Sequence, residues 1–157
     1  MNLTLKPVFG LSGSALKVIA MISMVIDHVA LYLMEHVIVL YETMRCIGRI
    51  AFPVFAFLIA EGFIHTRSRY RYFFTLLGFA VISEIPWYLL NGADGTHNVM
   101  FTLALGVATL MVLENLLQRS LVLGFLWTLG MAGLASWSGV DYEWRGILLI
   151  VILYLFN

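Results

Sequence analysis

Long apolar segments constrain this chain more than any other feature of its sequence. The hydrocarbon core of a bilayer is about 30 Å thick and needs roughly 20 apolar residues of helix to cross it. Four segments meet that length and a fifth is shorter: residues 16–34, 44–64, 72–90, 99–117 and 121–136. The pattern predicts an all-α protein, a polytopic transmembrane helix bundle in one integral membrane domain over residues 1–157.

The composition points the same way. Of the 157 residues, 62% are hydrophobic and 11% are charged, and the mean hydropathy is +0.96. Soluble domains average about 45–50% apolar and 25% charged residues. Nine Lys and Arg balance nine Asp and Glu, so the chain has no basic excess of the kind that binds nucleic acid. The lipid bilayer is therefore its expected partner.

The last apolar segment is too short to span comfortably. Residues 147–156 form about 15 Å of helix, or about 24 Å if the helix starts at Tyr142. We expect five full spans and a short sixth, C-terminal helix. Three explanations stay open: the bilayer thins there, the helix ends in a protein-lined cavity, or the chain is shorter than the unit that works.

Positive charges predict the orientation, because Lys and Arg are retained on the cytoplasmic side. With the N-terminus in the cytoplasm, the residues on the inner face are Lys6, Lys17, Arg67, Arg69, Arg71 and Arg119. The residues on the outer face are then Arg45 and Arg145. This asymmetry favours a cytoplasmic N-terminus.

Three ionisable side chains are predicted to lie at similar depth in different spans. Counting from the inner edge places His28 at about 17 Å, Glu84 at about 18 Å and Arg49 at about 21 Å. A charge near the bilayer centre costs about 2.5–3.5 kcal/mol on insertion scales, so such residues usually face a protein interior or a wet cavity. The coincidence predicts a polar site within the membrane.

Asp27 and His28 are neighbours about 100° apart on a helix, so they cannot both face one atom. We expect His28 to face the cavity, because a neutral imidazole accepts and returns a proton near pH 7. Asp27 would then pair with Arg49. The alternative is a packing salt bridge beside a satisfied core histidine.

Two prolines lie beside this polar layer. Pro53 cannot bond the carbonyl of Arg49, and Pro86 leaves the carbonyl of Ile82 free. Both positions are expected helix breaks next to a hydrated cavity, although an ordinary kink explains either proline alone.

Further polar residues are possible binding groups. Arg45, Arg49 and Phe52 share one stripe of the second span, although snorkelling alone explains Arg45. Glu61 either lines a cytoplasmic entrance or reaches the interface. Asn98 and Thr102 point towards an outer vestibule, and Asn98 is equally a helix cap. Three arginines follow the second span and bind anionic phosphates or serve topology alone: Arg67, Arg69 and Arg71.

The sequence excludes several kinds of site. Cys46 is the single cysteine, and no His-x3-His or His-Glu-x-x-His spacing occurs, so no metal site is expected. Glycine-rich nucleotide loops and nucleophile-elbow motifs are absent as well.

Four sequence motifs, in order and at appropriate spacing, resemble the TraX family. They are IDH at 26–28, RCIGRIAFPVFAFLIAEG at 45–62, SEIPW at 83–87 and NVMFTLALG at 98–106. The family is named for a membrane protein required to acetylate the N-terminus of conjugative F-pilin, and it is similar to multispanning acyltransferases that use cytoplasmic acetyl-CoA. By resemblance, its Asp-His pair falls on Asp27 and His28. Its Gly-Arg-x-x-Phe-Pro element falls on Gly48, Arg49, Phe52 and Pro53, and the start of its fourth helix on Asn98.

The resemblance implies an acetyltransferase of the bacterial inner membrane. Acetyl-CoA would be the donor, and a pilin terminus or an envelope glycan the acceptor. His28 would be a general base or a transiently acylated nucleophile, Arg49 would stabilise negative charge or hold Asp27, and Glu84 would orient the imidazole or relay its proton.

Two other functions fit the same polar layer. A small proton-coupled transporter also places ionisable residues at mid-membrane depth. A noncatalytic subunit of a pilus or secretion assembly would explain the short last helix. The sequence leaves a homo-oligomer open.

Overall fold

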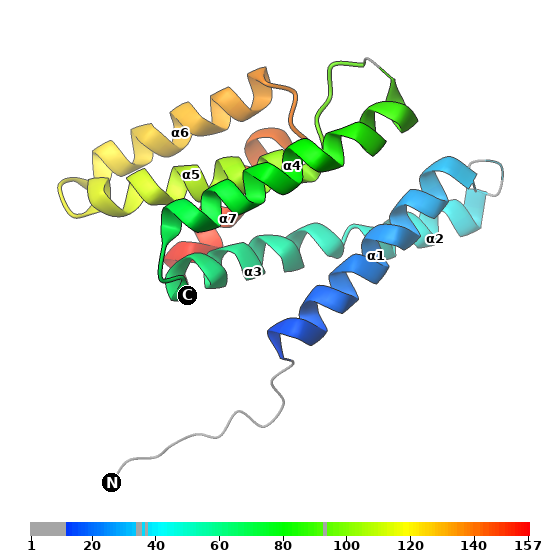
Figure 1. Ribbon diagram of the computed structural model, residues 1–157, viewed down its shortest axis with the longest axis horizontal. Helices are drawn as coiled ribbons and strands as arrows, with labels where there is room; N and C mark the ends of the chain where they lie inside the picture. The colour runs from blue at the N-terminus through cyan, green and yellow to red at the C-terminus, as the bar shows by residue number, and fades with distance from the viewer. Residues whose placement is uncertain (1–11, 34–35, 37, 93) are drawn as a thin grey trace, which may run out of the picture. The chain divides into compact units, whose positions relative to one another are not determined.

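The computed structural model describes residues 12–33, 36, 38–92 and 94–157, which form seven helices. The helices are α1 (Gly13–Leu33), α2 (Ile38–Gly48), α3 (Ala51–His65), α4 (Arg69–Asn91), α5 (Val99–Leu117), α6 (Leu121–Trp137) and α7 (Glu143–Leu155) (Figure 1). Within these ranges the only β pairing is an isolated bridge between His97 and Val140. The all-α prediction is confirmed.

Four helical stretches are long and apolar enough to cross a membrane: Gly13–Leu33, Ile38–His65, Arg69–Asn91 and Val99–Leu117. The fifth, α6, is apolar but has 17 residues, and α7 has 13. The polytopic helical bundle is therefore confirmed, with a shorter fifth helix and a short last one. The cytoplasmic N-terminus stays a prediction.

The second span differs from the expected continuous helix over 44–64. It begins at Ile38, and α2 ends at Gly48 before α3 starts at Ala51. Pro53 lies in the first turn of α3, where its missing N–H costs no helical bond. The break expected beside Pro53 is confirmed, and it interrupts the stripe on which Arg45, Arg49 and Phe52 were expected to lie.

Pro86 behaves differently from Pro53. It lies inside α4, which continues as one helix from Arg69 to Asn91. A second helix break at this depth is therefore wrong. Five residues follow Pro86 in the helix, so helical hydrogen bonds on both sides of the proline maintain the helix across the lost bond.

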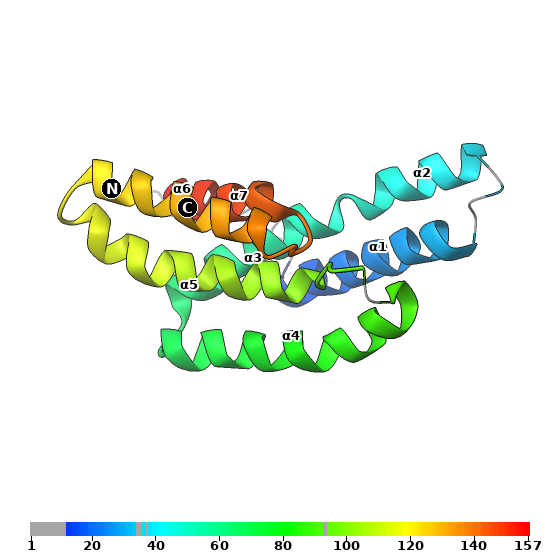
Figure 2. The ribbon, with the colours of Figure 1, turned by 90° about the horizontal axis from the view of Figure 1, so that it is seen from above.

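The chain divides into two compact units within α3, between Leu58 and Ile59. The single integral membrane domain expected over residues 1–157 stays a prediction. In the first unit, α1 and α2 form an antiparallel hairpin and lie side by side in both views (Figures 1 and 2). Gly48 is buried in this hairpin, where an added Cβ would overlap the side chain of Asp27. The missing side chain allows the two helices to approach closely at Asp27.

In the second unit, α5 is the central helix and contacts α4, α6 and α7. Figure 2 shows α5 and α6 running antiparallel from the tight turn that joins them. Buried side chains of α5, among them Val107 and Leu110, face an interior that also holds Ile147 and Ile150 of α7. Gly106 packs so closely against Ile150 that a Cβ there would overlap it. This packing holds α4 and α7 against α5. Polar contacts of this unit lie at the ends of these helices.

Candidate functional site

The α1–α2 hairpin joins Asp27 to Arg45. Arg45 Nη1 donates to Asp27 Oδ2 at 2.6 Å, and the two side chains are 22% and 25% exposed for Asp27 and Arg45. Each residue lies nine positions from His36 in the connection, so an antiparallel hairpin centred there brings them level. The pair offsets the cost of placing both charges in apolar spans.

The expected pairing of Asp27 with Arg49 is wrong. Arg49 follows the last residue of α2, one turn beyond Arg45, and its side chain is exposed. Because the second span starts at Ile38, the hairpin register places Arg45 level with Asp27. Among the described residues, the Arg49 guanidinium has no ion-pair partner.

The second oxygen of Asp27 is enclosed. Oδ1 is buried and has no hydrogen-bond donor among the described residues, and Gly48 packs against the same side chain. Asp27 therefore carries one charge-assisted hydrogen bond and one unsatisfied oxygen within the hairpin.

His28 has a defined proton arrangement. Its Nδ1 lies 2.8 Å from the carbonyl oxygen of Met24, one turn earlier in α1. A carbonyl only accepts, so Nδ1 carries the proton and the lone pair of a neutral ring remains on Nε2. The ring is half-buried and lies 6.2 Å from the ring of Tyr32. In this tautomer Nε2 is the nitrogen that can act as a general base or a nucleophile.

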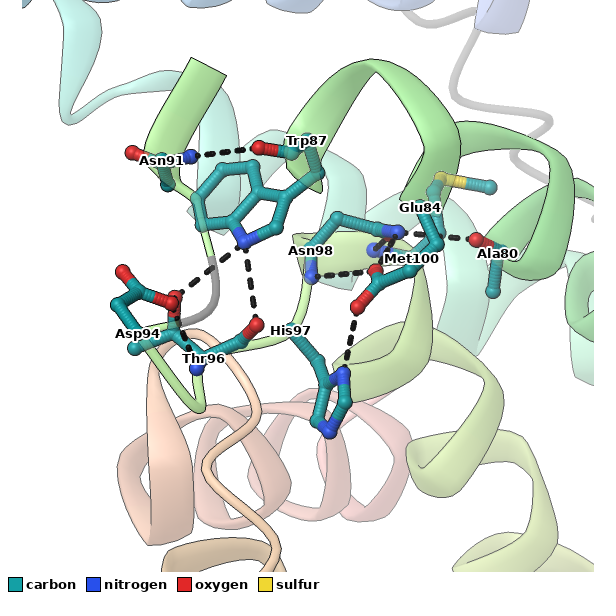
Figure 3. Close-up of polar contacts among 9 residues, drawn as sticks. All are labelled: Ala80, Glu84, Trp87, Asn91, Asp94, Thr96, His97, Asn98 and Met100. Atoms are coloured by element: carbon teal, nitrogen blue, oxygen red, sulfur yellow. Dashed lines mark hydrogen bonds and ion pairs between the residues drawn. The ribbon is translucent and has the colours of Figure 1, made fainter. Parts of the chain in front are cut away.

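Glu84 gathers a polar cluster near the end of α4 that Figure 3 shows. Its Oε1 lies 2.6 Å from His97 Nδ1, and its Oε2 accepts from Asn98 Nδ2 at 2.6 Å and from the Asn98 backbone N–H at 3.3 Å. Asn98 also donates to the carbonyl of Ala80 and caps α5 through Met100 N–H, both at 2.9 Å. Both Glu84 oxygens are thus occupied.

The cluster changes the expected role of Glu84. It orients an imidazole, but that of His97, which sequence reasoning missed. The signal that could have found His97 is its place beside Asn98 in a glycine-containing loop that returns to the end of α4. His28, Arg49 and Glu84 were expected to lie close together. His28 and Arg49 belong to the first unit and Glu84 to the second, so this stays a prediction.

Two loops meet at this end of the second unit. His97 N–H donates to the carbonyl of Gly139 at 3.0 Å, and Asp141 N–H donates to the carbonyl of His97 at 3.1 Å. Gly139 has φ 67°, and an added Cβ would meet the carbonyl oxygen of Gly95. Glycine is therefore required where the loops cross.

The loop itself is braced by hydrogen bonds (Figure 3). Asp94 Oδ1 accepts from Thr96 N–H at 2.9 Å and from Thr96 Oγ1 at 2.8 Å, and Trp87 Nε1 donates to the Thr96 carbonyl at 3.2 Å. The two Thr96 hydrogen bonds, that of the backbone N–H first, hold the pKa of the Asp94 carboxyl below its usual value. These contacts restrict where His97 lies.

Two residues expected to bind substrate are buried. Thr102 is fully buried, and its hydroxyl donates to the carbonyl of Asp141, which ties α5 to the loop before α7. Phe52 is 4% exposed at the start of α3. As placed, both side chains pack inside the protein.

At the opposite end of the second unit, Glu61 and Arg69 have partners. Glu61 Oε2 accepts from Asn157 Nδ2 at 2.6 Å, and its Oε1 lies 3.4 Å from His65 Nδ1. Arg69 forms a bidentate pair with Glu114, with one contact of 2.8 Å, so its guanidinium is engaged within the protein.

The other two arginines of this run line a hollow of about 380 Å³. Its lining residues are Thr66, Arg67, Ser68, Arg71, Tyr72 and Thr75. Ser68 caps α4 by accepting from Arg71 N–H, so the hollow includes the positive end of the helix dipole. The described residues contain no group of three His, Cys, Asp or Glu side chains that could hold a metal ion.

Comparisons with known proteins place the chain in a family. It is 36% identical over 135 residues to the probable fimbrial assembly protein FimC, serogroup H1, of Dichelobacter nodosus, covering 78% of this chain and 55% of that protein. It is 32% identical over 142 residues to an uncharacterized protein of Rickettsia prowazekii (strain Madrid E), covering 89% of this chain and 52% of that protein. The chain thus spans about half the length of these two relatives.

No solved structure gives a significant match. The family model described as TraX protein matches residues 12–157, almost the whole chain. The chain belongs to the TraX family.

Proposed function

We propose that this chain is an integral membrane acetyltransferase that moves an acetyl group from cytoplasmic acetyl-CoA to an amine or hydroxyl acceptor. A pilin N-terminus or an envelope molecule is the proposed acceptor, and pilus assembly the proposed setting. Membership of the TraX family supports this, and so does a relative named as a probable fimbrial assembly protein. The bacterial inner membrane is the proposed location.

The hydrogen bond between His28 Nδ1 and the Met24 carbonyl is the observation that carries the proposal. A base with a free Nε2 lies in a candidate membrane span, beside an Asp27–Arg45 pair that neutralises the neighbouring charge. Acetyl transfer needs a group that takes the acceptor proton or carries the acetyl group, and His28 supports either role.

Arg49 is the proposed stabiliser of the oxyanion. Since Arg45 neutralises Asp27, the Arg49 guanidinium is left for charge that develops on the thioester carbonyl oxygen. The helix break that follows α2 presents this residue outside a regular helix.

Donor binding is proposed for the hollow beside α4. Arg67 and Arg71 would hold the phosphates of acetyl-CoA, with the N-terminus of α4 adding its dipole. Arg69 supports this surface through Glu114 instead of binding phosphate itself.

The test is an acetyl-transfer assay on the full chain in proteoliposomes, with labelled acetyl-CoA and a short peptide whose N-terminal amine is free. A peptide with a blocked N-terminus is the acceptor control. We expect transfer by the wild type and a loss of about 100-fold or more in His28→Ala, because positioned bases contribute about 10²–10⁴-fold. The exposed His36 provides the matched control His36→Ala, which should keep wild-type transfer.

Two outcomes contradict parts of this proposal. Equal transfer by the wild type and His28→Ala removes His28 from the reaction. A wild type that transfers no label to a free amine or hydroxyl acceptor above the protein-free background removes the acetyltransferase proposal itself.

A further inference from the structure

The Glu84–His97 pair has the arrangement of a carboxylate-oriented base. His97 Nδ1 lies 2.6 Å from Glu84 Oε1, so the proton is on Nδ1 and the lone pair of the neutral ring is on Nε2. The His97 side chain is 46% exposed, whereas that of Glu84 is 27% exposed. The inner nitrogen is thus held by the carboxylate, and the ring remains accessible.

The backbone of His97 is fixed on both sides. Its N–H and its carbonyl are bonded to Gly139 and Asp141 of the loop before α7. The next residue, Asn98, is 4% exposed and bonds Glu84 through both its side chain and its N–H. This degree of preorganisation is what a catalytic side chain requires.

We propose that His97 is a second catalytic base, which takes the proton of the acceptor, with Glu84 and Asn98 as positioning residues. The proposal rests on the acetyl transfer proposed above. The N–H or O–H bond of the acceptor breaks, its proton moves to Nε2, and the freed electron pair bonds to the acetyl carbonyl carbon. The bond from that carbon to the sulfur of CoA breaks, and CoA leaves as the thiolate with that electron pair. The Glu84 carboxylate stabilises the imidazolium that forms.

The charged groups on the elements around His97 are Glu84, Asp94, Asp141, Glu143 and Arg145. The Asp94 carboxylate is engaged by Thr96, and Asp141 Oδ1 accepts from Tyr142 N–H at 2.9 Å. The charge of Asp94 also acts on His97, whereas Glu84 bonds the ring directly, at 2.6 Å.

The experiment compares two acceptors on the full chain in proteoliposomes with labelled acetyl-CoA. One acceptor is a short peptide with a free N-terminal amine, and the other is hydroxylamine, which is uncharged near neutral pH and needs little help from a base. We expect His97→Gln to lose about 100-fold or more of peptide acetylation and to keep hydroxylamine acetylation within about threefold. His65, whose Nδ1 also bonds within the protein, supplies the control His65→Gln, which should acetylate both acceptors normally.

Glu84→Gln gives a second readout that a structural role would not move. Glutamine keeps an oxygen for Asn98 but removes the charge beside His97. Without the carboxylate oxygen that accepts the Nδ1 proton, the ring is no longer held with Nε2 free, so peptide acetylation should fall while hydroxylamine acetylation stays within about threefold of the wild type.

The other possible results contradict the role of His97, the role of Glu84 or the acetyltransferase proposal. The role of His97 is overturned, while acetyl transfer stands, if His97→Gln loses activity equally with both acceptors or keeps wild-type peptide acetylation. Equal activity of Glu84→Gln and the wild type towards the peptide overturns the positioning role of Glu84. A wild type inactive with both acceptors overturns the acetyltransferase proposal, and the role of His97 with it.

Discussion

Arg45 and Arg49 lie one helical turn apart, and either could pair with Asp27 by sequence alone. In the structure Asp27 pairs with Arg45. Depth counted from polar residues of the second span misplaces that span, because Glu42 and Thr43 lie inside α2 instead of ending it. Thr43 satisfies its own hydroxyl by donating to the carbonyl of Val39 at 2.8 Å. A polar side chain whose hydrogen bond is made within its own helix does not mark where that helix ends.

The pairing predicts different stability effects for the two arginines. Arg45→Ala leaves Asp27 unpaired among apolar residues and should lower the free energy of unfolding by about 1–3 kcal/mol, below the range for a fully buried pair because both side chains are partly exposed. Arg49→Ala should change it by less than about 0.5 kcal/mol. Thermal unfolding in detergent measures both. The double variant Asp27→Asn, Arg45→Ala should recover part of the loss, and a larger loss in Arg49→Ala would contradict the pairing.

At the scale of the element, the two prolines occupy different environments. Pro53 lies in the first turn of α3, and two residues, Arg49 and Ile50, separate that helix from α2. Pro86 lies inside α4 and removes a bond to the carbonyl of Ile82. The same residue type therefore marks a helix start in one span and a tolerated defect in the other.

This difference predicts opposite outcomes for substitution by alanine. Pro86→Ala restores a hydrogen bond and should raise the free energy of unfolding by about 1 kcal/mol or more. Pro53→Ala should change it by less than about 0.5 kcal/mol, since a first-turn N–H has no helical acceptor. Thermal unfolding of the two variants side by side is the measurement. A Pro53→Ala variant stabilised as much as Pro86→Ala would argue against the helix start at Ala51.

At the scale of the molecule, apolar length predicts the helices and their order. α5 and the body of α4 follow the predicted spans closely, because their ends coincide with polar loop residues. Hairpin register is not encoded in apolar length, so the partner of Asp27 was missed. The Glu84–His97 pair was missed because it depends on how residues 94–98 turn back towards α4, and that path depends on contacts with residues 139–141, distant in the sequence.

The orientation of the whole chain in the membrane gives a further prediction. In a Cys46→Ser background, Asp94→Cys lies in the loop after α4 and Arg119→Cys in the turn after α5, and both positions are exposed. With a cytoplasmic N-terminus, a membrane-impermeant maleimide added to intact cells or spheroplasts should label Asp94→Cys, while Arg119→Cys should react only after lysis. The reverse labelling pattern would invert the orientation, and Cys46→Ser alone provides the background signal.

The bridge between His97 and Val140 has a consequence for biogenesis. Val140 leaves the ribosome only after α5 and α6 have been made, so the segment that carries His97 enters the membrane without its later anchor. Until residues 139–141 emerge, the N–H and carbonyl of His97 lack the partners that they have in the folded chain. A chain truncated during synthesis before Val140 would therefore hold Glu84 and His97 on the same polypeptide without the support that fixes the imidazole.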